Sequence, residues 1–365
     1  MKYNVNEKNI LWLDSVPKLT QREKSKIYET LGDTSKLSSM GLVKSSIEEI
    51  IGSERINGFI QLYNNDTINT KLLYLDKVGV KFITIESSEY PEKLKVIPNP
   101  PLILYYMGDI TLLHSKSIAI IGSRLCSSYG ENVTQLYSRV LSQYGVTIVS
   151  GMAEGVDAIA HKNSLEAGGK TLAVLGSGFN HIYPISNKNL ANSIVKNGLI
   201  ITEFEPNMAP TKYSFPMRNR IIAGISDAVL VTEAGEKSGT QYTINYAMEN
   251  NRNIYAVPGN ITSKRSALCN KLIKECQCCI TLNPEDILLD MNLIQLPINQ
   301  YKTIQVDMEE KIVLDAFEGE NSEVHFDILL DKSKLDIKKL ITLLTNLEIS
   351  GIIKKLPGNR YIILN

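Results

Sequence analysis

The chain contains few of the residues from which metal centres and disulfide frameworks are built. Its 365 residues include four histidines, five cysteines and one tryptophan. The cysteine number is odd, which does not suit the paired cysteines of a secreted domain. Four cysteines crowd together at spacings that are unusual for zinc, so we expect them to be packed in an apolar interior and expect no bound metal. These four are Cys269, Cys276, Cys278 and Cys279.

An excess of charge of one sign is also absent. The chain has 39 Lys and Arg residues against 39 Asp and Glu residues, so its net charge gives no general attraction to nucleic acid or to a membrane. An anion site must therefore depend on locally placed cations. No long hydrophobic run occurs, and the first residues lack the apolar stretch and cleavage site of a signal peptide. We expect a cytoplasmic protein without membrane contact.

The centre of the chain, residues 79–290, alternates short apolar strands with helical patterns. Strands that are apolar throughout are typical of a parallel sheet covered by helices on both faces. This pattern predicts an α/β fold, an extended Rossmann-like domain with a parallel sheet. The expected strands are 118–121, 146–149, 171–175, 199–202, 228–232 and 253–257.

Different patterns flank this centre. Residues 1–78 predict a domain of short amphipathic helices, including helices at 23–31 and 47–62. Residues 291–303 have no clear period and predict a linker. Residues 304–365 predict three helices and two strands, which is the pattern of a small winged helix.

Glycine-containing turns follow the carboxyl ends of four predicted strands. Ligands of open α/β sheets bind beyond that edge, and glycine lets the backbone approach an anion closely. Helices that begin there add unpaired N–H groups and the positive end of their dipole. The turns therefore predict a phosphate-binding site. Its residues are Gly122, Ser123, Arg124, Gly151, Gly176, Gly178, Ser238, Gly239 and Thr240.

Arginines add positive charge near these turns. Arg124 directly follows the first turn, and Arg218, Asn219 and Arg220 stand at the predicted start of a helix behind Pro216. Guanidinium groups suit bidentate phosphate contacts. The alternative for Arg218 and Arg220 is an ion pair with an acid inside the fold, at 203, 205 or 233. For Ser238 the alternative is plain capping of the next helix.

Catalytic candidates are weak. Asp157 and His161 can pair on one face of a helix, but no nucleophile at a fixed spacing accompanies them. A Walker A motif and the G-x-G-x-x-G motif of dinucleotide sites are both absent, so we expect no cofactor and no catalytic residue. Tyr129, Tyr183 and Tyr213 are candidates for stacking on bases, with ordinary packing as the alternative.

The order of the motifs resembles the DNA-processing protein A family (DprA, also called Smf). The motifs are AIIGSR (119–124), SYG (128–130), VSGMAEGVDAIAH (149–161), VLGSGFNHIYP (174–184), FPMRNRIIAGISDAVLVTEA (215–234), SGT (238–240) and YAVPGN (255–260). EYPEKL (89–94) and LEISGIIKKLPGNRYI (347–362) are also similar to that family.

This resemblance implies a non-enzymatic protein that binds and protects single-stranded DNA and helps to load RecA onto it in natural transformation. It implies a homodimer formed through the Rossmann-like domain, and an N-terminal domain of the SAM or helix-hairpin-helix type. By matching position it assigns Gly122, Ser123 and Arg124 to the DNA pocket, with Arg218 and Arg220 on the same surface.

The sequence departs from the family pattern at several positions. Glu154 stands where the family commonly has Arg, Asn180 where it often has Asp, and Ile185 where a basic residue is frequent. Leu268 and Cys276 replace glycines. In the N-terminal region, residues 17–20 lack the glycines of the P-G-[IV]-G turn.

Two other functions remain open. Lysine-decarboxylase-like (LOG) nucleotide hydrolases use P-G-G-x-G-T-x-x-E, but here Thr243 stands in place of the glutamate, and Glu233 would have to substitute for it. An adaptor acting through the winged helix is the other alternative, because the predicted helix 337–347 is mostly apolar.

Overall fold

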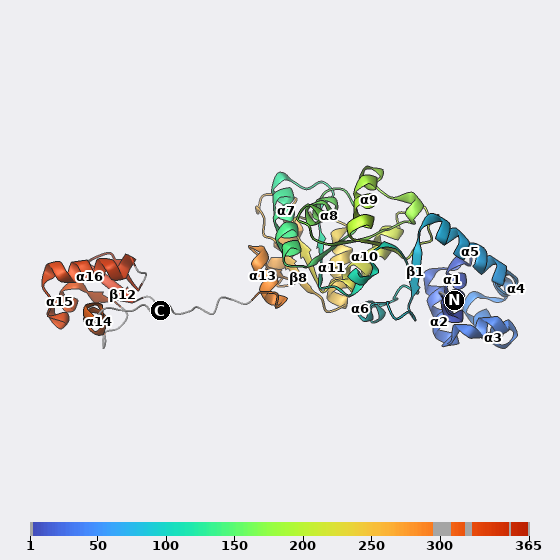
Figure 1. The fold of residues 1–365 in the computed structure, drawn as a ribbon, viewed down its shortest axis with the longest axis horizontal. Coiled ribbons are helices and arrows are strands. Elements are labelled where there is room, and N and C mark those ends of the chain that lie inside the picture. The colour runs from blue at the N-terminus through green and yellow to red at the C-terminus, as the bar shows by residue number, and fades with distance from the viewer. Residues whose placement is uncertain (1–2, 295–307, 318–322, 350–351, 364–365) are drawn as a thin grey trace. The chain divides into compact units, whose positions relative to one another are not determined.

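The computed structural model describes residues 3–294, 308–317, 323–349 and 352–363 (Figure 1). The chain divides into two compact units, Met1–Ile294 and Gln295–Asn365. Most of the predicted linker 291–303 lies outside the described residues. Within the part of the chain that the structure describes, no helix is both long and apolar enough to cross a membrane.

The first unit begins with helices that share a core with the edge of the sheet. They are α1 (Val5–Ser15), α2 (Gln21–Leu31), the 3₁₀ helix η1 (Thr34–Ser39), α3 (Met40–Ile51), α4 (Ser53–Leu62) and α5 (Asn65–Val78). Asn4 and Thr20 begin α1 and α2 with capping boxes. Trp12 and Phe59 pack in one cluster with Phe82 of the first strand. The helical residues thus belong to the same compact unit as the sheet.

Among the described residues, nine strands form the main sheet in the order β1-β2-β6-β5-β4-β3-β7-β8-β9. The strands are β1 (Lys81–Thr84), β2 (Ile103–Gly108), β3 (Ser117–Ile121), β4 (Thr147–Ser150), β5 (Thr171–Val174), β6 (Leu199–Thr202), β7 (Ala228–Val231), β8 (Asn253–Ala256) and β9 (Cys279–Ile280). All six predicted strands are present. The strands β3, β4, β5, β6, β7, β8 and β9 are parallel to one another. Strands β1 and β2 add an antiparallel edge that the sequence pattern did not predict.

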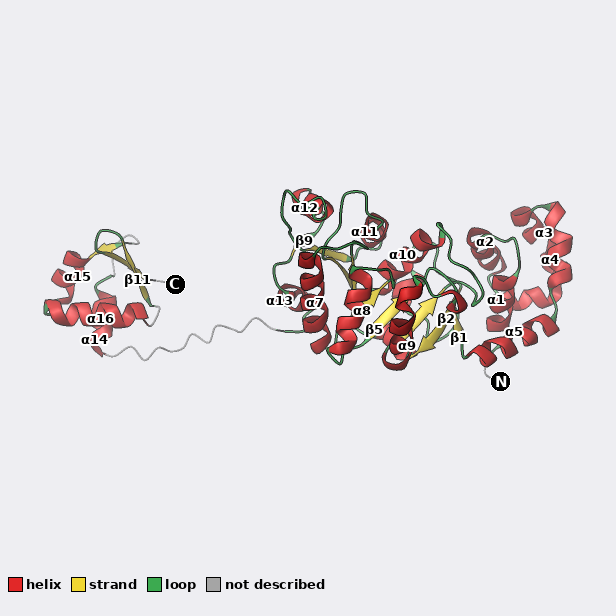
Figure 2. Ribbon diagram, turned by 90° about the horizontal axis from the view of Figure 1, so that it is seen from above, coloured by secondary structure: helices red, strands yellow, loops and turns green. Residues whose placement is uncertain are grey.

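Helices cover both faces of this sheet (Figure 2). They are α6 (Glu92–Lys95), α7 (Ser128–Gln143), α8 (Val156–Glu166), α9 (Lys188–Asn197), α10 (Ser214–Ile225), α11 (Thr240–Glu249), α12 (Ala267–Lys274) and α13 (Pro284–Asp290). Strand β3 shows why the pattern is apolar throughout. Ile118 and Ile120 pack on the face of α7, while Ala119 and Ile121 pack on the opposite face, that of α10.

The strand order reverses at β3, and this decides where a ligand can bind. From β3 the chain runs through β4 and β5 to β6 on one side, and β7 and β8 follow on the other side. The loops after β3 and β7 therefore separate toward opposite faces and leave a crevice at the carboxyl end of the sheet.

The second unit contains α14 (Met308–Asp315), α15 (Phe326–Ser333) and α16 (Ile337–Ile349), with a three-stranded antiparallel sheet in the order β10-β12-β11. The strands are β10 (Val324–His325), β11 (Ile353–Leu356) and β12 (Arg360–Ile363). The buried residues of α16 include Leu340, Leu344 and Leu347. These leucines form the core of the unit, so the apolar composition of α16 is mainly that of a core helix and is not by itself a sign of a protein-binding surface.

Candidate nucleic-acid interface

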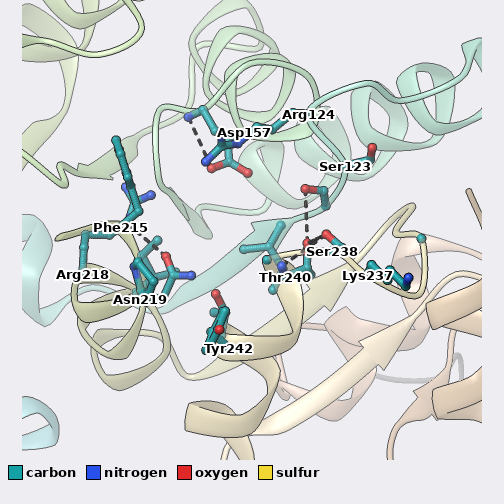
Figure 3. A pocket seen from close by; sticks show the side chains of 18 of the residues that line it. Ser123, Arg124, Asp157, Phe215, Arg218, Asn219, Lys237, Ser238, Thr240 and Tyr242 are labelled. Carbon is teal, nitrogen blue, oxygen red and sulfur yellow. Dashed lines mark hydrogen bonds between the residues drawn. The ribbon is translucent and has the colours of Figure 1, made fainter. Parts of the chain in front are cut away.

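A pocket of about 790 Å³ opens at the reversal of the strand order. Its walls come from the loops after β3, β4 and β7 and from the first turns of α10 and α11. Figure 3 shows the labelled side chains arranged around this space, with Arg218 and Asn219 on one side and Lys237 on the other. The polar and charged lining residues are Ser123, Arg124, Asp157, Lys212, Arg218, Asn219, Glu236, Lys237, Ser238, Thr240, Tyr242 and Thr243.

The turn after β3 is built from close backbone contacts. The Ser123 N–H donates to the Glu233 carbonyl at 2.7 Å, which joins this turn to the one after β7. A Cβ atom at Gly122 would lie 2.7 Å from the same carbonyl, so the approach requires glycine. Arg124 follows at the exposed rim, and its guanidinium lies 5.8 Å from the Phe215 ring centre. No ion pair within the described residues includes Arg124, so its charge is available to an anion.

Arg218 holds the loop after β4 from inside. Its Nη1 donates to the carbonyls of Gly151, at 2.6 Å, and of Val174. Asp157 accepts from the Gly151 N–H at 3.1 Å and from the Ala153 N–H at 3.4 Å. Burial lowers the pKa of Arg218 to about 10 and raises that of Asp157, and the opposite charges of the two groups reduce both shifts. Arg218 therefore keeps its charge at neutral pH at the base of the pocket.

The turn before α11 accepts a hydrogen bond from the start of that helix and also lines the pocket. The Thr240 N–H donates to Ser238 Oγ at 3.2 Å, and Thr240 Oγ1 bonds to the Gly122 carbonyl at 3.3 Å. Gly239 lines the pocket between them with no atom within 4 Å of its Cβ position. Ser238 thus bonds the first amide of the helix and also faces the pocket.

Four of the predicted site residues do not line this pocket. Arg220 is buried and pairs with Glu203 at 2.5 Å, which is the alternative that the sequence left open. Cβ atoms at Gly176 and Gly178 would meet Phe215 at 2.8 Å and the Glu205 carbonyl at 2.0 Å. These glycines are required by packing between loops. Gly151 lines a small adjoining cavity of about 40 Å³ together with Arg124, Glu154 and Tyr183.

Side chains that the sequence did not place also line the pocket. Lys212 precedes α10, Lys237 follows β7, and both are exposed. Phe215 and Tyr242 supply aromatic surface. The sequence does contain a signal that could have selected Lys237, because this residue lies in the loop that joins the fifth predicted strand to the Ser238–Thr240 turn. Of the three candidate tyrosines, Tyr183 lines the small cavity, and Tyr129 is bonded through its hydroxyl to the Pro258 carbonyl.

The suggested pair of Asp157 and His161 does not form a hydrogen bond among the described residues. His161 is fully buried, and its Nδ1 bonds to Thr171 Oγ1 at 2.6 Å. Burial and the nearby charge of Arg218 lower the pKa of His161 to about 3, so the ring is neutral at physiological pH. It supports the underside of the site and does not face the pocket.

The cysteines differ from one another in exposure. Cys269 is buried, as predicted, but Cys276 and Cys279 are exposed, so the expectation of apolar burial was wrong for these two. In the described ranges no group of three or more His, Cys, Asp or Glu side chains is arranged to hold a metal ion.

Comparison with known proteins identifies the family. The model of the DNA recombination-mediator protein A family matches residues 81–292. The chain belongs to this family. It is 34% identical over 299 residues to protein Smf of Escherichia coli strain K12, which covers 80% of each chain. The resemblance drawn from the ordered motifs is thereby confirmed.

Solved structures agree with this assignment. The crystal structure of DNA processing protein A (DprA) from Streptococcus pneumoniae is 30% identical with a TM-score of 0.68, over 80% of this chain and 99% of that one. The protein of the same name from Helicobacter pylori is 31% identical with a TM-score of 0.53, over 58% and 96%. That structure is described as revealing a single-stranded DNA binding mode. The α/β sheet domain of this chain is therefore that of the family.

Proposed function

We propose that the pocket binds the backbone phosphates of single-stranded DNA and that the protein acts without catalysing a reaction. The observation that carries this proposal is the convergence of Arg124, Lys212, Arg218 and Lys237 on one pocket at the carboxyl edge of the sheet. They outnumber the two acids of the lining, Asp157 and Glu236, although the whole chain is neutral. Local cations thus supply the attraction that the net charge lacks.

The positions of the carboxylates in and near the pocket argue against a hydrolase of the LOG type. Thr243 lines the pocket at the position where those enzymes have glutamate. The possible substitute, Glu233, is buried, and its carboxylate accepts from the Ser127 N–H at 2.7 Å and from the Ser127 hydroxyl at 2.6 Å. It fixes the start of α7 and does not line the pocket. Asp157 is bound by two amides, and Glu236 lies at the exposed rim.

Arg124→Ala tests the proposal. We expect the affinity for single-stranded DNA to fall by about tenfold or more, because a charge-assisted contact to phosphate is lost. The slope of log affinity against log salt should fall by about 0.7 for each phosphate contact removed. Fluorescence anisotropy with a labelled oligothymidylate at several salt concentrations measures both quantities.

Lys170→Ala is the matched control. Lys170 is exposed and directly precedes β5, at the opposite edge of the sheet, so its removal lowers the charge equally without touching the pocket. Equal affinity of the Arg124→Ala variant and the unchanged protein would contradict the proposal. Release of free base from AMP would contradict the non-catalytic role.

Membership of the family supports several further properties of the chain. We infer that the N-terminal helices form a SAM or helix-hairpin-helix type domain and that the second unit is a winged helix. We infer that the protein acts in the cytoplasm as a homodimer through the Rossmann-like domain. Its role would be to protect incoming DNA in natural transformation and to help load RecA. Co-purification with RecA in the presence of single-stranded DNA tests the last point.

A further inference from the structure

Exposed cations continue beyond the pocket along the loops that follow β7 and β8. Lys237 lies in the loop after β7 and already lines the pocket. Lys264 and Arg265 lie in the loop between β8 and α12, and both side chains are exposed.

The loop that carries Lys264 and Arg265 is held against the loop after β7. The Lys264 carbonyl lies 3.1 Å from the Cβ position of Gly235, which lines the pocket. The Leu268 N–H donates to the Ala234 carbonyl at 3.0 Å. The close approach of the Lys264 carbonyl to Gly235 and this hydrogen bond from the first turn of α12 therefore keep the loop beside the pocket wall.

The loop is also ordered by its own hydrogen bonds. The Thr262 N–H donates to Asn260 Oδ1 at 2.9 Å, and the Ser266 N–H donates to the Ser263 carbonyl at 3.1 Å. The Arg265 N–H donates to Ser263 Oγ at 3.3 Å. These turns hold the backbone of Lys264 and Arg265 in a defined conformation next to the pocket, so less entropy is lost when a ligand binds there.

These cations have no acidic partner among the ion pairs of the described residues. Other cations of the same unit do, such as Lys71 with Glu205 and Arg139 with Glu166. Glu236 is the exposed acid of the neighbouring loop. Three unpaired like charges along adjacent loops repel one another, and a polyanion would relieve this repulsion.

We propose that Lys237, Lys264 and Arg265 form a cationic track that binds the phosphates of a DNA strand after it leaves the pocket. This inference rests on the proposed function, since the strand must first occupy the pocket. A single strand suits the track because its phosphates can follow a bent path over two loops. The pocket and the track would then contact successive parts of one strand.

The double variant Lys264→Ala/Arg265→Ala tests the track. Its binding affinity is measured for two oligothymidylates, one of about four and one of about twenty nucleotides. We expect the longer oligonucleotide to bind roughly tenfold more weakly, with a salt slope smaller by about 1.4 for two lost contacts. The affinity for the short oligonucleotide, which reaches only the pocket, should not change. That unchanged affinity also shows that the variant is folded.

Lys116→Ala/Lys170→Ala is the matched control, because both residues are exposed and directly precede parallel strands at the opposite edge of the sheet. Unchanged binding of the long oligonucleotide by the Lys264→Ala/Arg265→Ala variant would overturn the track and leave the proposed function standing. An equal loss for both oligonucleotides would overturn it too, because the two residues would then act on the pocket. If the unaltered protein bound neither oligonucleotide, the proposed function itself would fail.

Discussion

Two arginines of the FPMRNR motif have different roles although one residue separates them. Residues two positions apart on a helix point about 200° away from each other. Arg218 therefore reaches the loop after β4 and the pocket, while Arg220 reaches Glu203 at the end of β6. A single helix face cannot present both to one ligand. The basic surface implied by the motif consists here of Arg218 together with Arg124 and the two lysines of the lining.

Cys276 occupies a backbone position that favours glycine. It follows α12 with a φ of 53°, its N–H donates to the Ile273 carbonyl, and the Gln277 N–H donates to the Leu272 carbonyl. This is the Schellman arrangement, in which the residue after the helix adopts the left-handed conformation. The family resemblance places glycine here, and the structure supplies the physical reason.

Cys276→Gly should stabilise the protein by about 1 kcal/mol, because a side chain in the left-handed conformation costs roughly that amount. Urea unfolding of the first unit, followed by circular dichroism, measures the change. Cys276→Ala is the control, since alanine removes the thiol but keeps the unfavourable conformation. If both variants gained equal stability, the effect would come from the thiol and not from the backbone.

At the scale of elements, a single predicted helix is divided into two helices, α3 and α4. The pattern of residues 47–62 predicts a continuous helix, but Gly52 separates α3 from α4 with φ 86° and ψ 153°. This region of backbone conformation is accessible mainly to glycine. Apolar periodicity continues across the break because Ile47, Ile51, Ile56 and Phe59 all pack into one cluster. Periodicity alone therefore does not reveal the break.

Gly52→Ala should lower the free energy of unfolding by about 1–3 kcal/mol through backbone strain. No atom lies within 4 Å of the Cβ position, so a steric clash cannot account for the loss. Gly58→Ala is the control: Gly58 lies inside α4 with equally open space, and alanine there should stabilise by about 0.5–1 kcal/mol. Opposite signs in chemical denaturation are expected, and a gain in both variants would contradict the role of Gly52.

At the scale of the whole molecule, every residue that lines the pocket belongs to the first unit. Each unit has its own buried cluster, and that of the second unit is built around Val313, Leu340 and Leu344. The proposed binding pocket is therefore lined by the first unit.

A chain ending at residue 294 should bind single-stranded DNA with an affinity within about twofold of the full chain, because no pocket contact is removed. Titration of both proteins with the same labelled oligonucleotide at one salt concentration measures this. A loss of tenfold or more would mean that the second unit contributes to single-strand binding. Retained single-strand affinity with lost duplex affinity would assign the duplex contact to that unit.

The sequence by itself determined the α/β class, the six central strands and the edge of the sheet at which the pocket lies. Apolar strands that alternate with helices allow one kind of sheet, and the chain direction places every following turn at the same edge. It also determined the family, because the motifs occur in a specific order. Gly122, Arg124 and the Ser238–Thr240 turn could be selected for the same reason, since they directly follow strands.

Only the tertiary structure decided which of these residues meet. Arg218 and Arg220 have the same chemistry and neighbouring positions, and burial beside Glu203 separates their roles. Lys212 lines the pocket although it does not follow a predicted strand, because the fold brings the turn before α10 to the same pocket as the loops after β3 and β7. The exposure of a charge and the nearness of an acid depend on contacts between strands far apart in sequence, so local patterns do not contain them.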